Sequence, residues 1–418
     1  MIGVRRPARW WAEARTWRVV AALGIFGPGV IAASAGNDAG GILTYASAGS
    51  QFAYRTLFAM VLVTVGLVIV QEMAARLGAH TGEGLVSLIR EHFPLRLAGA
   101  AVLALVVANL GIVVSEFAGI GAALEYFGVS RYVSVPLAAL GVWAAVVLGS
   151  YRYAERVFLI LTLVFLAYPV AAVLGHPHWG TVADQTLTPH FLATRPFLVL
   201  VVALIGTTIT PYMQLYQAAA VVDKGIGAEE LGRVRIDSVV GSIVACLVSM
   251  AIIVATAATI GGTGPLRSVA QAADALRPAA GARAGALFAV GLLGASALAA
   301  AIVPLSTAYA ISEAVGVERS VSRSFREAPL FVGLFTGQVV LGAAVALAPG
   351  NLVALLLNTQ VLNGVITPVI LTFILVLANR RSVLGTAANG PVHRVVATVC
   401  VVAIALMAVA VVVQTVAG

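Results

Sequence analysis

The chain is dominated by long apolar segments that follow one another with short polar connections. Eleven such segments have their centres near residues 34, 65, 110, 140, 165, 210, 247, 299, 338, 365 and 404. A helix of about 20 apolar residues crosses the roughly 30 Å hydrocarbon core of a bilayer. The apolar runs are continuous, whereas strands of a membrane β-barrel alternate between apolar and polar residues. The sequence therefore predicts an all-α membrane protein with 11 transmembrane helices.

The composition agrees with this prediction, because 61% of the 418 residues are hydrophobic and only 10% are charged. Soluble globular proteins do not have such a balance. The apolar segments carry no HExxH motif, no facing pair of catalytic aspartates and no Ser/His pair. We therefore expect a membrane carrier and not an enzyme.

The distribution of basic residues predicts the orientation of the chain. If the N-terminus lies in the cytoplasm, only six of the 25 Lys and Arg residues fall on outer loops, and these are Arg55, Arg131, Arg195, Arg267, Arg277 and Arg283. Basic loops stay on the cytoplasmic side. We therefore expect a multi-pass protein of the cell (inner) membrane with a cytoplasmic N-terminus and an outer C-terminus. The net charge of +8 reflects this topology and not a nucleic-acid partner.

The organisation along the chain is simple, because no long polar linker separates the apolar segments. Residues 1–18 are basic and rich in Trp, and they read as a cytoplasmic N-terminal leader. Residues 19–418 read as a single transmembrane transport domain. We expect this domain to act as a monomer in the lipid bilayer.

Two of the apolar segments are interrupted by Gly and Pro. The first contains Gly27-Pro28-Gly29 and a glycine cluster from Gly36 to Gly41, and the sixth contains Gly206 and Pro211. Both residue types weaken a helix. Interrupted helices five segments apart are typical of inverted-repeat transporters that bind substrate at the two breaks. Segments 1–5 and 6–10 would form the repeats. The alternative is that Gly and Pro only permit close helix packing.

The ionisable residue at the first break is Asp38, which follows Asn37. A carboxylate in an apolar segment is costly and therefore a functional candidate. We expect Asp38 to bind a metal cation, with Asn37 as an adjacent ligand and with Thr207 and Thr210 contributing from the sixth segment. The alternative is that Asp38 only caps a helix that begins near Gly40.

Two further polar residues lie in apolar segments. Gln360 in the tenth segment shares a helix face with Asn363, and it either reaches the metal as a ligand or gate, or forms a hydrogen bond between helices. Glu116 in the third segment either belongs to the ion pathway or carries a proton, or it is a buried residue with an Arg or backbone partner. A third acid, Glu72, reads as a helix-surface ion pair with Arg76.

At these residues the sequence resembles the Nramp family of divalent metal transporters, most closely its magnesium-transporting branch. The resemblance lies in "GPGVIAASAGNDAGG", "QEMAARLGAHTGEGL", "SEFAGI", "IGTTITPYMQLYQAAAVVDKG", "FREAPLF" and "TQVLNG". It covers essentially the whole membrane domain. It implies a LeuT-like fold that alternates access by moving broken helices 1 and 6.

The metal motifs depart from those of typical Nramp members. The first motif is Asp-Pro-Gly-Asn in the family and Asp38-Ala39-Gly40-Gly41 here, so that the acid is kept and the amide ligand is lost. In the sixth motif, Thr210 stands where the family has a metal-binding Met. Thioether sulfur favours transition metals, whereas hydroxyl, carbonyl and carboxylate oxygens suit Mg²⁺ and Ca²⁺. The departures predict transport of partly hydrated Mg²⁺ with tolerance of Mn²⁺, and no other cofactor.

The groups that carry protons in the family are also largely replaced. Tyr212 and Gln217 stand where the resemblance places histidines, and Val113 replaces the first of two acids in the third segment. No His lies within a predicted span, and His is the side chain that titrates unperturbed near neutral pH. We therefore expect uncoupled or weakly proton-coupled uptake. The alternatives are a proton-coupled Mn²⁺/Fe²⁺ importer and a Na⁺-coupled amino-acid carrier.

Overall fold

The computed structural model describes residues 37–148, 163–315 and 328–417, and its regular secondary structure there is entirely helical. The leader at residues 1–18 and the Gly27-Pro28-Gly29 motif lie outside these ranges. The longer helices are α3 (Ala39–Phe52), α4 (Leu57–Thr81), α5 (Leu85–His92), α6 (Leu95–Tyr126), α7 (Arg131–Val147), α9 (Ala167–Leu174), α10 (Trp179–Leu187), α11 (Arg195–Thr208), α12 (Pro211–Asp223), α13 (Leu231–Ile260), α16 (Ala284–Val315), α17 (Pro329–Ala346), α18 (Leu352–Asn379) and α20 (Pro391–Ala417).

Within the described residues, eight helices are long and apolar enough to cross a membrane, and one of them is the pair α11 and α12 counted together. Helix α7 is a shorter apolar helix. The expected first and fifth segments fall partly outside the described ranges. Within those ranges, they are represented only by α3 and the short α9. The structure thus supports a multi-pass helical membrane protein, while the total of eleven helices stays a prediction.

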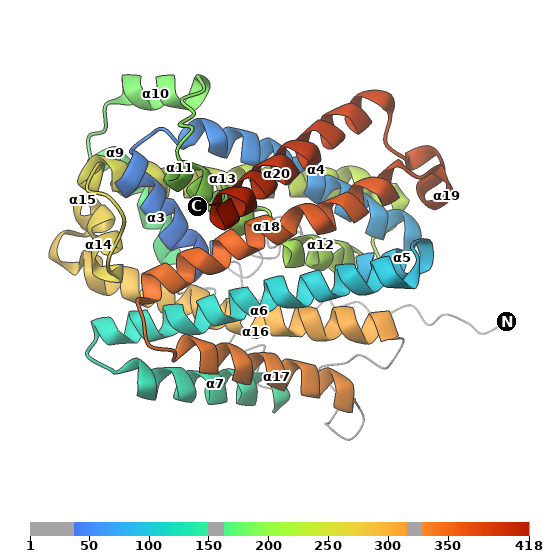
Figure 1. Ribbon diagram of the computed structural model, residues 1–418, viewed down its shortest axis with the longest axis horizontal. Helices are drawn as coiled ribbons and strands as arrows, with labels where there is room; N and C mark the ends of the chain where they lie inside the picture. Colours follow the sequence, from blue (N-terminus) through green and yellow to red (C-terminus); the bar gives the residue numbers. More distant parts are fainter. Residues whose placement is uncertain (1–36, 149–162, 316–327, 418) are drawn as a thin grey trace, which may run out of the picture.

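The helices pack into one bundle (Figure 1). Helices α6 and α16 lie side by side, α7 and α17 run along one edge, and α20 packs on α18. Helix α3 is enclosed by α13, α18, α11 and α6. The N-terminal end of α3, where Asp38 lies, is therefore held inside the bundle.

Helix α11 and helix α12 form one interrupted span. Helix α11 ends at Thr208, Ile209 and Thr210 leave the helical conformation, and α12 begins at Pro211. Proline has no N–H to donate to the Thr207 carbonyl, and it favours the first position of a helix. The break therefore follows from Pro211, as the sequence predicts.

Gly206 does not contribute to the break, because it lies inside α11. A Cβ atom added there would overlap the Gln360 carbonyl oxygen and the Gly364 backbone nitrogen of α18. A Cβ atom added at Gly364 would likewise overlap the Val202 carbonyl oxygen of α11. The expectation that Gly206 interrupts the helix is thus wrong, and its role is to let two helix backbones touch.

Loops that the basic-residue count assigns to the same side meet in the structure. The Arg131 guanidinium donates to the Gly350 carbonyl over 3.1 Å, and the Asn351 amide donates to the Arg267 carbonyl over 3.4 Å. At the other end of the bundle, Arg235 of α13 contacts α4. The chain therefore alternates between two faces of the bundle, and which face is cytoplasmic stays a prediction.

The pairing of Glu72 with Arg76 is confirmed at 3.0 Å, but its expected place on a helix surface is wrong. Both residues are buried, with exposed fractions of 8% and 4%. The other Glu72 oxygen accepts from Arg235 Nε at 2.7 Å, and Arg76 also donates to Asn389. Hydrogen bonds from several helices thus compensate for the burial of these charges.

Two histidines lie in membrane-length helices, which corrects the expectation that none does. His80 belongs to the last turn of α4, and His393 lies near the start of α20. His393 Nε2 is 3.8 Å from a Glu72 oxygen. Both positions are at helix ends, away from the Asp38 region.

Candidate functional site

An acidic residue, Asp38, lies at the start of α3. Asp38 is the N-cap residue of α3, with extended backbone, and its Oδ1 accepts a hydrogen bond from Gly41 N at 2.7 Å. Its Oδ2 is buried and has no partner among the described residues. Both the capping role and an available carboxylate oxygen are therefore present in one residue.

Glu116 of α6 contacts the same turn. It is fully buried, and its Oε2 accepts from Ala39 N at 3.4 Å, while Oε1 has no partner among the described residues. Glu116 thus has a backbone donor, as one of the two interpretations of this residue requires. Two carboxylates are consequently close to one helix turn. Burying two negative charges there costs free energy unless a cation compensates for them.

The α11–α12 break supplies hydroxyl groups to this centre. Tyr45 of α3 and Thr208 of α11 are hydrogen-bonded through their hydroxyls at 3.0 Å, which ties the first span to the break. Thr207 and Thr210 are fully buried; the Thr207 hydroxyl has no partner among the described residues, and the Thr210 hydroxyl is in reach of Tyr212. Tyr212, in the first turn of α12, lies within electrostatic range of both Asp38 and Glu116.

Gln360 reaches the first turn of α3 from α18. A Cβ atom placed on Gly40 would overlap the Gln360 amide nitrogen and come within 2.7 Å of Ser115 Oγ. The Gln360 amide is fully buried and has no hydrogen-bond partner among the described residues. The alternative of an interhelical hydrogen bond is therefore not seen, and the amide stays available at the centre.

Asn37 differs from the other predicted residues. It is partly exposed, and its Oδ1 accepts a hydrogen bond from Ser249 Oγ of α13 at 3.2 Å. It therefore faces α13, whereas Gln360 and Glu116 approach from α18 and α6. The side-chain oxygen of Asn37 is therefore already occupied.

The apolar replacement at position 113 is tightly packed. Val113 is fully buried, and a Cβ atom on Gly342 of α17 would lie 2.5 Å from Val113 Cγ1. The contact between α6 and α17 therefore leaves no space beside Val113, one turn before Glu116. Glu116 thus has no acidic neighbour at that position.

Sequence reasoning missed several residues around the centre. Ser115 and Ser296 are fully buried, and Ser296 lies against Gly119, one turn after Glu116, with its hydroxyl in reach of the Glu116 carboxylate. Tyr45, which contacts the break, also carries no pattern that marks it in the sequence. Ser115 could have been noticed in the sequence, because it directly precedes Glu116. Ser296 is distant in sequence, and only the packing of the helices reveals it.

The donors at this centre are mainly oxygen atoms. Among the described residues, no group of three or more His, Cys, Asp and Glu side chains is placed to hold a metal. Two carboxylates, threonine hydroxyls and an amide remain. Such a set suits a hard cation that keeps part of its water shell.

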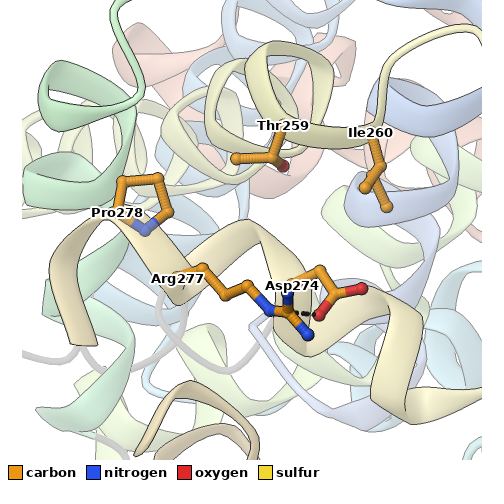
Figure 2. A pocket seen from close by; sticks show the side chains of 5 residues that line it. All are labelled: Thr259, Ile260, Asp274, Arg277 and Pro278. Atoms are coloured by element: carbon orange, nitrogen blue, oxygen red, sulfur yellow. Dashed lines mark ion pairs between the residues drawn. The ribbon is translucent and has the colours of Figure 1, made fainter. Parts of the chain in front are cut away.

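A pocket of about 460 Å³ elsewhere does not belong to this centre. Figure 2 shows that it lies between the end of α13 and a short helical stretch before α16, and it is lined by Thr259, Ile260, Asp274, Arg277 and Pro278. Its two charged residues form an ion pair at 2.8 Å. The pocket therefore offers no free charge.

The fold and the buried centre define a multi-pass membrane transporter. The sequence profile described as Natural resistance-associated macrophage protein-like (Nramp) matches residues 29–414. The chain belongs to the Nramp family.

Named relatives support this assignment, and solved structures share the fold. The divalent metal cation transporter MntH of Ralstonia nicotianae is 30% identical, over 89% of this chain and 86% of the relative. MntH of Aeromonas hydrophila is 26% identical, over 90% and 91%. The Eremococcus coleocola manganese transporter superposes with a TM-score of 0.74 at 21% identity, over 92% of this chain and 85% of that one.

A more distant structure shares the architecture. Mhp1, a nucleobase-cation-symport-1 family transporter, superposes with a TM-score of 0.53 at 13% identity, over 94% of this chain and 93% of that one. These likenesses establish a LeuT-like helical fold. They bear on the fold alone.

Proposed function

We propose that this protein carries divalent metal cations across the membrane and binds the ion between Asp38 and the α11–α12 break. The observation that carries the proposal is the buried Asp38 Oδ2, which has no partner among the described residues and lies beside a second buried acid. A dication compensates for both charges at once. The names of the relatives MntH support the same substrate class.

The roles of the surrounding residues follow from their positions. Thr207 and Thr210 contribute from the break, Gln360 acts as a ligand or gate against Gly40, and Asn37 orients the turn through Ser249. Glu116 serves the ion pathway. The protein acts as a monomer with its N-terminus in the cytoplasm, where the basic loops lie.

Donor chemistry favours Mg²⁺ as the transported ion. Thr210, the residue directly before α12, offers a hydroxyl where the family has a thioether, and Gly41 offers no side-chain amide. Mg²⁺ binds oxygen and gives up its water reluctantly, so that a site with small side chains suits it.

A proton-coupled Mn²⁺ importer is the second candidate. The observation that favours it is the substrate named for the similar proteins, which include a manganese transporter. Glu116 would then be the group that carries the proton. Manganese also accepts oxygen ligands, so that the same centre can hold it.

Flux into proteoliposomes, with internal pH recorded, separates the two candidates. We expect Mg²⁺ and Mn²⁺ to enter the proteoliposomes without acidification of their interior. An inside-negative membrane potential drives this entry, because it contributes about 2.3 kcal/mol per charge per 100 mV. Acidification that depends on metal influx would establish the second candidate. Absence of uptake for Mg²⁺, Mn²⁺ and Ca²⁺ would contradict the proposed function.

Thr210→Met should move the ion preference toward soft metals. A thioether at the start of α12 adds a ligand that Mn²⁺ and Cd²⁺ accept and Mg²⁺ does not. We expect the Mn²⁺/Mg²⁺ uptake ratio to rise about tenfold, which corresponds to roughly 1.4 kcal/mol. Thr210→Val is the matched control, since it removes the hydroxyl without adding sulfur. An unchanged ratio in Thr210→Met would refute the donor argument.

A further inference from the structure

The joint between α5 and α6 meets the end of α18 at one end of the bundle. The Phe93 ring packs edge-on against the Phe373 ring of α18, with centroids 4.8 Å apart. Arg380, directly after α18, lies over the Phe93 ring at 4.7 Å, and its Nη1 donates to the His92 carbonyl at 2.9 Å. Helix α19 (Arg381–Leu384) follows, and Figure 1 shows α5 and α19 at the same end of the bundle. These contacts hold the two joints together.

The Arg380 guanidinium is fixed by these contacts but not used up by them. The cation–π contact with Phe93 restrains the group, and the His92 carbonyl occupies only one of its two terminal nitrogens. The side chain is partly exposed, and no described residue accepts a hydrogen bond from its other nitrogens. A planar guanidinium held in this way can bind a phosphate group through two parallel hydrogen bonds.

Two more arginines flank this group. Arg381 directly follows Arg380, and Arg96 lies three residues after Phe93, in the first turn of α6. Both are exposed. We call Arg96, Arg380 and Arg381 the arginine triad. Among the described residues, no member of the triad forms an ion pair.

Other charged residues at this end of the bundle have partners elsewhere. Arg76 and Arg235 both pair with Glu72, and Arg90 of α5 donates to carbonyl groups at the end of α16. Glu91 lines a pocket on α5 together with Arg90. The arginine triad therefore presents three positive charges that no described carboxylate pairs with.

The lengths of the helices place the triad at the level of lipid headgroups. Helix α6 has 32 residues and α18 has 28 residues, which correspond to about 48 Å and about 42 Å. A bilayer with its headgroup regions is roughly 40–45 Å thick, so the ends of both helices lie near its surface. Leu95 and Leu97, on either side of Arg96, are 82% and 49% exposed. Positive charge and exposed apolar side chains thus occur together at this level.

We propose that the arginine triad binds the phosphate headgroup of an anionic phospholipid, whose acyl chains lie along α6 beside Leu95 and Leu97. Basic side chains at a membrane surface attract anionic lipids, and basic pockets between membrane helices bind their headgroups. The bound lipid bridges the α5–α6 joint and the α18–α19 joint. The proposal does not depend on which metal the protein carries.

Lipid binding to the purified full-length protein in detergent tests the proposal. We expect native mass spectrometry to show phosphatidylglycerol bound in preference to phosphatidylcholine with the same acyl chains. Arg96→Gln/Arg381→Gln should bind phosphatidylglycerol at least about tenfold more weakly, because each basic residue at a membrane surface strengthens the attraction severalfold. Lys224→Gln/Arg233→Gln removes two exposed charges near the α12–α13 connection and should bind like the unmodified protein. Equal weakening in both double variants, or no weakening in the first, would overturn the proposal.

Two further measurements address the geometry of the site and the source of the phosphate. Arg380→Lys keeps the charge but cannot form two parallel hydrogen bonds, so the affinity for phosphatidylglycerol should fall about threefold or more. An unchanged affinity would overturn the proposed site. Inorganic phosphate in excess should not displace the lipid, because it has no acyl chains to contact Leu95 and Leu97. Complete displacement would show a general anion site and overturn the assignment to a lipid.

Discussion

Asp38→Asn lowers metal uptake by at least about 100-fold. The Asn side chain keeps an oxygen that accepts the Gly41 N–H, so that the cap of α3 survives, but the negative charge is lost. Removing one partner of a buried charge interaction costs about 3 kcal/mol of binding free energy. Each 1.4 kcal/mol lowers the affinity for the metal about tenfold. The measurement is the initial rate of Mg²⁺ and Mn²⁺ uptake, together with metal binding in detergent.

Two comparisons make this prediction specific. Asp184→Asn removes an acid from the exposed helix α10 and should leave uptake unchanged. Asp38→Ala removes cap and charge together, so it should also lower the stability of the purified protein, by about 1 kcal/mol. Uptake by Asp38→Asn at the rate of the unmodified protein would rule out this carboxylate as the metal ligand.

Gly206→Val should destabilise the protein strongly. The added side chain would collide with the backbone of α18 at Gln360 and Gly364, and a backbone cannot rotate away as a side chain can. Overpacking of this kind costs about 3 kcal/mol. We expect a lower melting temperature in detergent and a loss of the monodisperse peak in size-exclusion chromatography.

Gly337→Val in α17 is the matched control, because no described atom lies within 4 Å of a Cβ atom there. It should melt like the unmodified protein. If Gly206→Val and Gly337→Val had equal melting temperatures, the close approach of α11 and α18 would not be a source of stability. Metal binding by Gly206→Val should also weaken, since Gln360 sits at this contact and reaches the first turn of α3.

Local chemistry explains the features that were predictable from sequence. Pro211 ends α11 because it has no N–H, and Asp38 begins α3 because its side chain caps the first turn. Both effects act within a few residues. The sixth-span break and the cap could therefore be inferred without coordinates.

Contacts between distant segments were not predictable in the same way. Gly206 reads as a helix breaker until α18, more than 150 residues later, is seen against it. Glu72 reads as a surface residue until Arg235 and the loop before α20 close over it. The sequence contains these residues and their neighbours but does not show that they meet.

The cap at Asp38 also bears on how quickly the carrier can work. The amino end of a helix bears a partial positive charge, so α3 holds the carboxylate firmly while repelling any cation that the carboxylate attracts. Because attraction by the carboxylate and repulsion by the helix end act at the same place, the cation is bound only weakly. A carrier needs this compromise, because cargo held too tightly would never be delivered.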